Sequence, residues 1–220
     1  MQQYLEFVDT VLSDGTYKPN RTGVDTISSF SEHYEVDLGE GYPLLTTKGM
    51  DGYRWHSMLH EVCWYLSGEE HIRNLREETK IWDAWADDEG RLDTAYGRFW
   101  RRYPIPEGES WPDAAHRWVT EEADGRQTFD QLQYVIDTLA ESPNSRRLVV
   151  NAWHPANAAV STLPPCHYSF VFNVQGDRLN CHLTQRSGDT ALGIPFNIAA
   201  YALLTKVIAQ QTGFEPGTFA

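Results

Sequence analysis

Residues 167–186 constrain the fold more than any other part of this chain. Two segments with the apolar and polar alternation of β-strands, 167–175 and 178–186, flank the dipeptide Gly176-Asp177. A Gly-Asp pair between two such segments is typical of a two-residue hairpin turn. We therefore expect an antiparallel strand pair here, with a third strand at 146–153.

Helical periodicity surrounds these strands. Apolar residues recur at helical spacing in four longer segments, 2–13, 54–67, 127–143 and 196–213. The last is so apolar that we expect it to be buried on most sides. A short helix near 69–78 and strand material over 24–38 complete the expected elements.

The order of these elements predicts the fold class. Helices and strands are mixed without regular strand–helix–strand alternation, which favours an α+β fold with a mixed sheet flanked by helices. A length of 220 residues suits one domain, 1–220. Residues 103–126 are rich in Pro, Glu, Asp and Gly, so we expect an exposed insertion there.

Charge and hydropathy narrow the class of protein. The chain has 18 basic and 31 acidic residues, a net charge of −13, which argues against nucleic acid as its main partner. No apolar run reaches the roughly 18 residues of a membrane helix. The acidic N-terminus does not resemble a signal peptide, so we expect a cytoplasmic protein. Because lysines are few, the acidic surface suits a high-salt cytoplasm.

The three cysteines differ in context. Cys63 lies on the apolar face of a predicted helix and Cys181 in an alternating strand, so both are expected to be packing residues. Cys166 follows Pro164 and Pro165, which suits either a positioned nucleophile or an ordinary turn into a strand. An odd, low count predicts no disulfide framework. No Cys-x-x-Cys or His-Glu-x-x-His spacing indicates a metal site.

Several polar residues have both a functional and an ordinary interpretation. Arg186 and Ser187 end a predicted strand just before a helix, where a guanidinium, a hydroxyl and backbone amides would suit a phosphate monoester. Arg146 and Arg147 follow a helix end, where cations complement carbonyl dipoles without any ligand. Glu61, taken alone, is an ordinary helix carboxylate.

Taken together, the motifs of the chain resemble one family, thymidylate synthase. They occur in the family's order and cover nearly the whole chain: NRTG (20–23), PLLTTK (43–48), HE (60–61), IWDAWAD (81–87), AYGRFWR (95–101), SRR (145–147), PPCH (164–167), QRSGD (185–189) and LGIPFNIAAYALL (192–204). The full set is specific, whereas any single motif is weak.

The resemblance implies reductive methylation of dUMP to dTMP, with 5,10-methylenetetrahydrofolate as one-carbon and hydride donor. The Cys166 thiolate would add to C6 of uracil and make C5 nucleophilic. Glu61 and Tyr96 would serve proton transfer, and Asn197 would pair with the uracil edge. The implied nucleotide-binding residues are Arg21, Arg186, Ser187, His167, Gln185 and Asn197. The implied folate-binding residues are Ile81, Trp82, Trp85, Asp189, Leu192, Gly193 and Phe196.

The resemblance also implies a homodimer in which Arg146 and Arg147 reach the phosphate of the other subunit. The chain stops at Ala220, ahead of the family's sugar-binding His-x-Tyr segment and closing tail. We therefore expect a family member that is incomplete at the C-terminus and forms no dTMP by itself. The alternatives are a pyrimidine nucleotide hydroxymethylase, a non-catalytic nucleotide-binding or dimerising remnant, and a cysteine hydrolase.

Overall fold

A five-stranded mixed sheet forms the centre of the molecule. The computed structural model describes residues 2–20, 23–108 and 112–220. The strand order is β3-β10-β9-β8-β7, with every neighbouring pair antiparallel except the parallel β9 and β10. The bounds are β3 Val36–Asp37, β7 Val149–Asn151, β8 His167–Gln175, β9 Arg178–Gln185 and β10 Glu215–Phe219. The mixed sheet and the helices around it confirm the α+β class.

The predicted hairpin is confirmed. Gln175 pairs with Arg178, which leaves Gly176 and Asp177 as the two-residue turn, and Gly176 has a φ of 66°. A positive φ is the backbone conformation that glycine adopts without a steric penalty. The third strand is shorter than the predicted 146–153, since only Val149–Asn151 pairs with β8.

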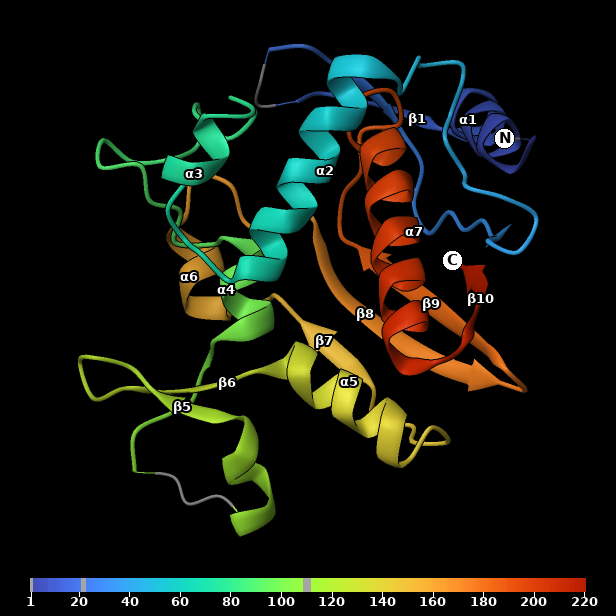
Figure 1. The fold of residues 1–220 in the computed structure, drawn as a ribbon. Helices are drawn as coiled ribbons and strands as arrows, with labels where there is room; N and C mark the ends of the chain where they lie inside the picture. Colours follow the sequence, from blue (N-terminus) through green and yellow to red (C-terminus); the bar gives the residue numbers. More distant parts are fainter. Residues whose placement is uncertain (1, 21–22, 109–111) are drawn as a thin grey trace.

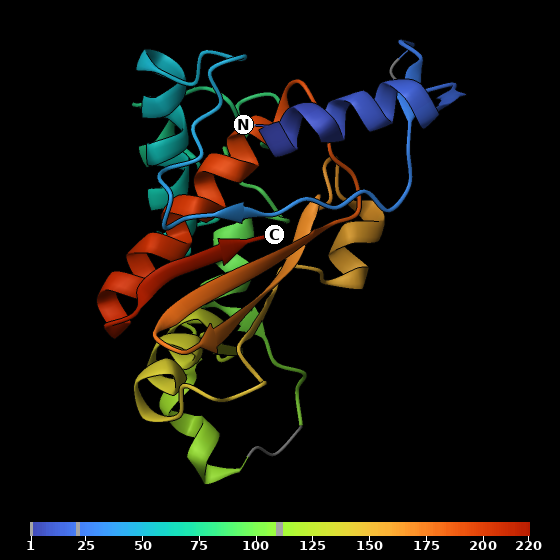
Figure 2. The same cartoon turned by 90° about the vertical axis from the view of Figure 1, so that its right-hand side faces the viewer.

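Helices cover one face of this sheet. Helix α7, Gly193–Thr212, packs on β9 and β10 and lies beside α2, Gly52–Ser67 (Figures 1 and 2). Most of α7 is buried, including Tyr201 and Leu204, as its composition predicts. Helix α5, Gln131–Glu141, packs against β7 and α7. Helix α1, Gln2–Asp14, contacts β2, Thr26–Ser28, away from the centre of the sheet. No helix in the described part of the chain is long and apolar enough to cross a membrane.

Three predicted elements differ from the structure. Residues 127–129 form strand β6 rather than the start of α5, because the Asp130 side chain accepts from the backbone N–H of Gln133 at 2.9 Å and caps the helix there. The stretch 24–38 contains only two short strands, β2 (Thr26–Ser28) and β3. Strand β2 pairs with β1, Thr16–Lys18. Within 69–78 only Arg73–Arg76 is helical, as α3.

The segment expected to be an insertion, 103–126, forms a small three-stranded sheet together with the strand that follows it. Its strands are β4 (Tyr103–Pro104) and β5 (Val119–Glu121), which pair on either side of β6, Gln127–Phe129. The 3₁₀ helix η1, Asp113–Trp118, precedes β5. Figure 1 shows this sheet below the main one. That the segment is an insertion relative to its family stays a prediction.

One glycine determines how closely two helices of the core approach. Helix α4, Tyr96–Arg101, packs against α2, and a Cβ added at Gly97 would lie 2.2 Å from the backbone oxygen of Tyr65. No side chain fits in that space, so only glycine allows this contact. The close approach brings Tyr96 next to the ring of Tyr65, at a centroid distance of 5.3 Å. Helix α6, Pro155–Val160, follows β7.

Candidate active site

The segment before β8 is held by one arginine. Arg186, just after β9, donates from Nε to the Pro165 carbonyl at 2.8 Å and from Nη2 to the Pro164 carbonyl at 2.7 Å. Its backbone N–H donates to the carbonyl of Cys166 at 2.9 Å. The two prolines thus present adjacent carbonyls to a single guanidinium, which fixes the backbone that leads into Cys166.

The same guanidinium lies beside the thiol. Nη2 of Arg186 is 3.7 Å from Sγ of Cys166, a half-buried residue. On its other side, the backbone N–H of Cys166 donates to the hydroxyl of Tyr96 at 2.8 Å. The thiolate is the form of a cysteine that acts as a nucleophile. The structure therefore brings Cys166, Tyr96 and Arg186 together.

His167 joins this cluster from the buried face of β8. Its ring stacks on Tyr96 with the centroids 3.7 Å apart, and its Nδ1 is 2.7 Å from the hydroxyl of Tyr201 on α7. Burial lowers the pKa of His167 to about 3, so its imidazole is neutral at ordinary pH. Burial likewise raises the pKa of Tyr96 above its usual range. Both groups act here as neutral hydrogen-bonding side chains.

Glu61 is the carboxylate of the cluster. Its Oε1 accepts from the Tyr65 hydroxyl and from Nε1 of Trp82, both at 2.7 Å. Burial raises the pKa of Glu61, and the two donated hydrogen bonds oppose that shift. A raised pKa suits a group that exchanges a proton near neutral pH. Trp82 in turn packs on Tyr96, with ring centroids 6.1 Å apart.

Asn197 lies in the first turns of α7 and points to β9. Its side-chain amide donates to Oε1 of Gln185 at 2.8 Å, and Gln185 pairs with His167 across the hairpin. Gln185 therefore orients the Asn197 amide, with one amide hydrogen and the carbonyl oxygen left for a ligand. Ser187, two residues beyond Gln185, is exposed.

A groove with both charged and apolar lining lies between the first turn of α7 and the start of α2. It has a volume of about 620 Å³ and is lined by Lys48, Asp51, Tyr53, Arg54, Leu192 and Phe196. Ile81 and Trp85, on the segment after α3, are each 38% exposed. Asp189 accepts from the backbone N–H groups of Ala191 and Leu192 through Oδ1, and so holds the turn that opens α7 at Gly193.

Two of the predicted arginines, Arg146 and Arg147, do not join the cluster. Arg146 and Arg147 are exposed in the loop before β7, and the backbone of Leu148 bonds Phe172, six residues along β8 from Cys166. At about 3.3 Å per residue this separates the pair from Cys166 by roughly 20 Å. Arg21 lies outside the described residues.

The other two cysteines occupy opposite environments. Cys181 is buried, and burial raises its pKa to about 12, so the expected packing role is confirmed. The expectation that Cys63 is buried is wrong, because this residue is exposed on α2. The neighbouring apolar positions Val62 and Leu66 pack inward, and Cys63 lies on the edge of that face.

Sequence reasoning missed three groups that complete the site. Tyr65 bonds Glu61 and lies four residues after it on α2, a spacing that places both on one helix face. Tyr201, which bonds His167, has the same spacing from Asn197 on α7. Lys48 donates to the Ala191 carbonyl, and its Nζ is 6.0 Å from the Phe196 ring centroid. The two tyrosines could have been found from this spacing, and Lys48 from its place at the end of the PLLTTK motif.

Comparison with known proteins shows the family to which the chain belongs. Residues 2–220 match the family model described as thymidylate synthase. A thymidylate synthase of Haloferax volcanii is 71% identical over 219 residues. The match covers 98% of this chain but 63% of the length of that relative. The family resemblance of the motifs is thus confirmed along the chain.

Proposed function

The chain belongs to the thymidylate synthase family, and from that premise we propose that it carries the thiol and the nucleotide site of an enzyme that methylates dUMP to dTMP. The supporting observation is the cluster around Cys166, in which one guanidinium contacts both the thiol and the backbone before it. Because the chain spans 63% of its relative, the activity belongs to the protein at that relative's length.

The chemical task is to make C5 of a uracil ring nucleophilic. Addition of the Cys166 thiolate to C6 leaves negative charge delocalised over C5 and O4, which divides one difficult step into two easier ones. Arg186 lies beside the thiol and, with Ser187 and Arg21, is suited to the phosphate of dUMP. Free thiols persist most readily in a reducing compartment, which is consistent with the proposed cytoplasmic location.

Recognition of the base falls to the Asn197 amide. Its carbonyl can accept from N3–H of uracil, and its second amide hydrogen can donate to O4. The hydrogen bond from the Asn197 amide to Gln185 supports this role, because it restrains the amide. Glu61 and Tyr96 are suited to proton transfer near O4 and C5, since Glu61 has a raised pKa and Tyr96 bonds the nucleophile's own backbone.

The second substrate, 5,10-methylenetetrahydrofolate, fits the groove between α7 and α2. Leu192 and Phe196 line the groove and offer apolar and aromatic surface to a flat pterin and its aryl ring. We propose that the partly exposed Ile81 and Trp85 add to this surface. Asp189 is the hydrogen-bond acceptor next to Leu192. Lys48 and Arg54 line the groove and supply positive charge for the carboxylates of its glutamate moiety.

A homodimer would complete the phosphate site. In one subunit Arg146 and Arg147 lie roughly 20 Å along the sheet from Cys166, so their use at a phosphate requires a second copy. The sheet face opposite α7 carries the exposed Val149 and a groove lined by Asn173, Asn180 and His182. This uncovered face is the proposed dimer contact, related by a two-fold axis.

Product analysis tests the proposed reaction. The test uses the chain lengthened with the remaining residues of the Haloferax volcanii relative, which we call the extended protein. This protein is incubated in high salt with dUMP and methylenetetrahydrofolate. Formation of dTMP is the expected result. A hydroxymethylated nucleotide would assign the chain to the hydroxymethylases, and nucleotide binding without any product would make it a non-catalytic nucleotide-binding protein.

Subunit mixing tests the donated arginines. An extended Cys166→Ala protein and an extended Arg147→Glu protein are each expected to be inactive. Mixed and exchanged, they should regain part of the activity, because one site of the heterodimer has both an intact thiol and an intact donated arginine. Verified heterodimers without activity would mean that each subunit builds its own phosphate site.

A further inference from the structure

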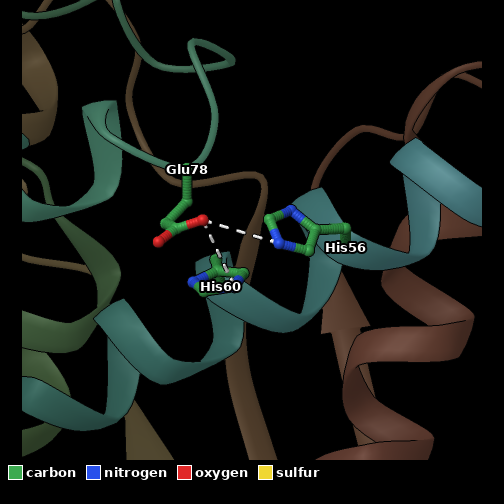
Figure 3. Close-up of side chains that lie close together, drawn as sticks. All are labelled: His56, His60 and Glu78. Atoms are coloured by element: carbon green, nitrogen blue, oxygen red, sulfur yellow. Dashed lines mark ion pairs between the residues drawn. The ribbon is translucent and has the colours of Figure 1, made fainter.

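A cluster of metal-binding side chains lies on the surface of α2, outside the site described above. His56 and His60 are one helical turn apart and face Glu78, which follows α3 (Figure 3). Nε2 of His56 is 3.5 Å and Nε2 of His60 is 3.7 Å from Oε2 of Glu78. The three potential ligand atoms all lie within 4.8 Å of one another.

From this geometry we propose that His56, His60 and Glu78 bind a divalent transition-metal ion of the Zn²⁺ type. Bonds of about 2.1 Å in a tetrahedron place neighbouring ligand atoms roughly 3.4 Å apart. The two nitrogen–oxygen distances, 3.5 and 3.7 Å, are already close to that value. Small rotations of the side chains suffice to close the site around an ion.

The ligand set selects the class of metal. Two imidazoles and one carboxylate suit Zn²⁺, Co²⁺, Ni²⁺ or Cu²⁺, whereas Mg²⁺ and Ca²⁺ prefer oxygen ligands only. Three protein ligands leave one tetrahedral position for water. The side chains are 48%, 34% and 42% exposed for His56, His60 and Glu78, so an ion can reach them from solvent.

The backbone that carries Glu78 is fixed against α2, which preorganises the site. Ser57 donates from Oγ to Oγ1 of Thr79 at 2.8 Å, and both residues are buried, at 1% and 3% exposed. Ser57 follows His56 and Thr79 follows Glu78, so this buried bond holds the neighbours of two ligands. The ion would thus join α2 to the segment after α3 at a point where they already meet.

An ion pair is the simpler interpretation of the same contacts, and it requires a protonated histidine. It differs from the metal site in its consequence. A pair needs no added component, whereas a metal site should bind one Zn²⁺ per chain with an affinity that depends on all three ligands. Cys63, exposed on the same helix, is a competing thiol ligand for Zn²⁺, and so is Cys166.

Isothermal titration of ZnCl₂ into the 220-residue chain tests the proposal. The background carries Cys63→Ser and Cys166→Ala, so that neither accessible thiol contributes. We expect one Zn²⁺ per chain, with affinity at least tenfold weaker in His56→Ala and in the near-isosteric Glu78→Gln. The control His116→Ala, an exposed histidine on η1, should bind as the background does. Equal affinities in all four proteins would overturn the proposal.

Thermal unfolding provides a second readout that does not depend on heats of binding. At a hundredfold excess of Zn²⁺ over its dissociation constant, the melting temperature of the background should rise by roughly 5–10 °C. MgCl₂ at the same concentration should not raise it, and neither ion should raise that of Glu78→Gln. An equal rise with Mg²⁺, or a Zn²⁺ rise retained in Glu78→Gln, would contradict a transition-metal site at these residues.

Discussion

The cluster around Cys166 and the groove between α7 and α2 are built in opposite ways. In the cluster, each functional side chain is bonded or stacked within this chain, as in the stacking of His167 on Tyr96 at 3.7 Å. In the groove, Leu192 is 66% exposed, and apolar surface faces solvent. The proposed reactive half of the site is held in place by contacts within the chain, whereas the proposed folate half consists of partly exposed side chains.

This difference predicts where substitutions act. Changes within the cluster should alter the rate or the stability of the fold, because its groups support one another. Changes in the groove should alter the apparent affinity for the folate and little else. The following tests, from the largest expected effect to the smallest, would break or sharpen that contrast.

Glu61→Gln should have the largest effect. Glutamine can still accept from Tyr65 and Trp82 but cannot exchange a proton, so dTMP formation by the extended protein should fall about 10²- to 10⁴-fold. Binding of dUMP, followed by titration calorimetry, should change little. Glu69→Gln is the matched control, because that carboxylate accepts from Asn74 outside the cluster. A near-normal rate for Glu61→Gln would remove Glu61 from the proton network.

Gly97→Ala should damage the packing that carries the cluster. The added methyl group would meet the Tyr65 backbone oxygen at 2.2 Å and force α4 away from α2. We expect a loss of about 1–3 kcal/mol in the free energy of unfolding, measured with urea. Gly193→Ala, where an added Cβ has no neighbour within 4 Å, should cost less than 1 kcal/mol. Equal losses in the two variants would contradict the close approach.

The pH dependence of stability should report the buried His167. Its pKa falls from 6.5 to about 3 on folding, so the unfolded chain binds the proton first. The stability it contributes is complete above pH 6.5 and is lost as the pH falls toward 3, by at most about 1.4 kcal/mol per pH unit. Urea unfolding of wild type and His167→Gln between pH 7 and pH 4 isolates this slope. Parallel curves would show that His167 is not held neutral.

Trp85→Ala should have the smallest effect, and only on the proposed folate contact. Loss of this exposed ring should raise the KM for methylenetetrahydrofolate several-fold, while dUMP affinity and unfolding free energy stay within about 0.5 kcal/mol of wild type. Steady-state kinetics with each substrate varied in turn separates the two. A matching loss of dUMP affinity would show that the groove and the cluster are not independent.

The contrast also explains how much the sequence could predict. The hairpin and the four longer helices follow from local periodicity and turn residues, and they are confirmed apart from their ends. The stacking of His167 on Tyr96 depends on a contact across about 70 positions of the chain, which periodicity cannot encode. The motifs identified most members of the cluster but not their partners Tyr65 and Tyr201. The exposure of Cys63 shows that an apolar helix face does not define its own edges.

Release of tritium from C5-labelled dUMP by the extended protein tests the central claim, that Cys166 is the nucleophile of this cluster. Addition of a thiolate to C6 labilises the hydrogen at C5, so release reports that addition. Cys166→Ala should abolish release, whereas Cys63→Ala should retain it and Cys181→Ala should do so with at most a packing cost. Tritium release by Cys166→Ala at the wild-type rate would contradict the account.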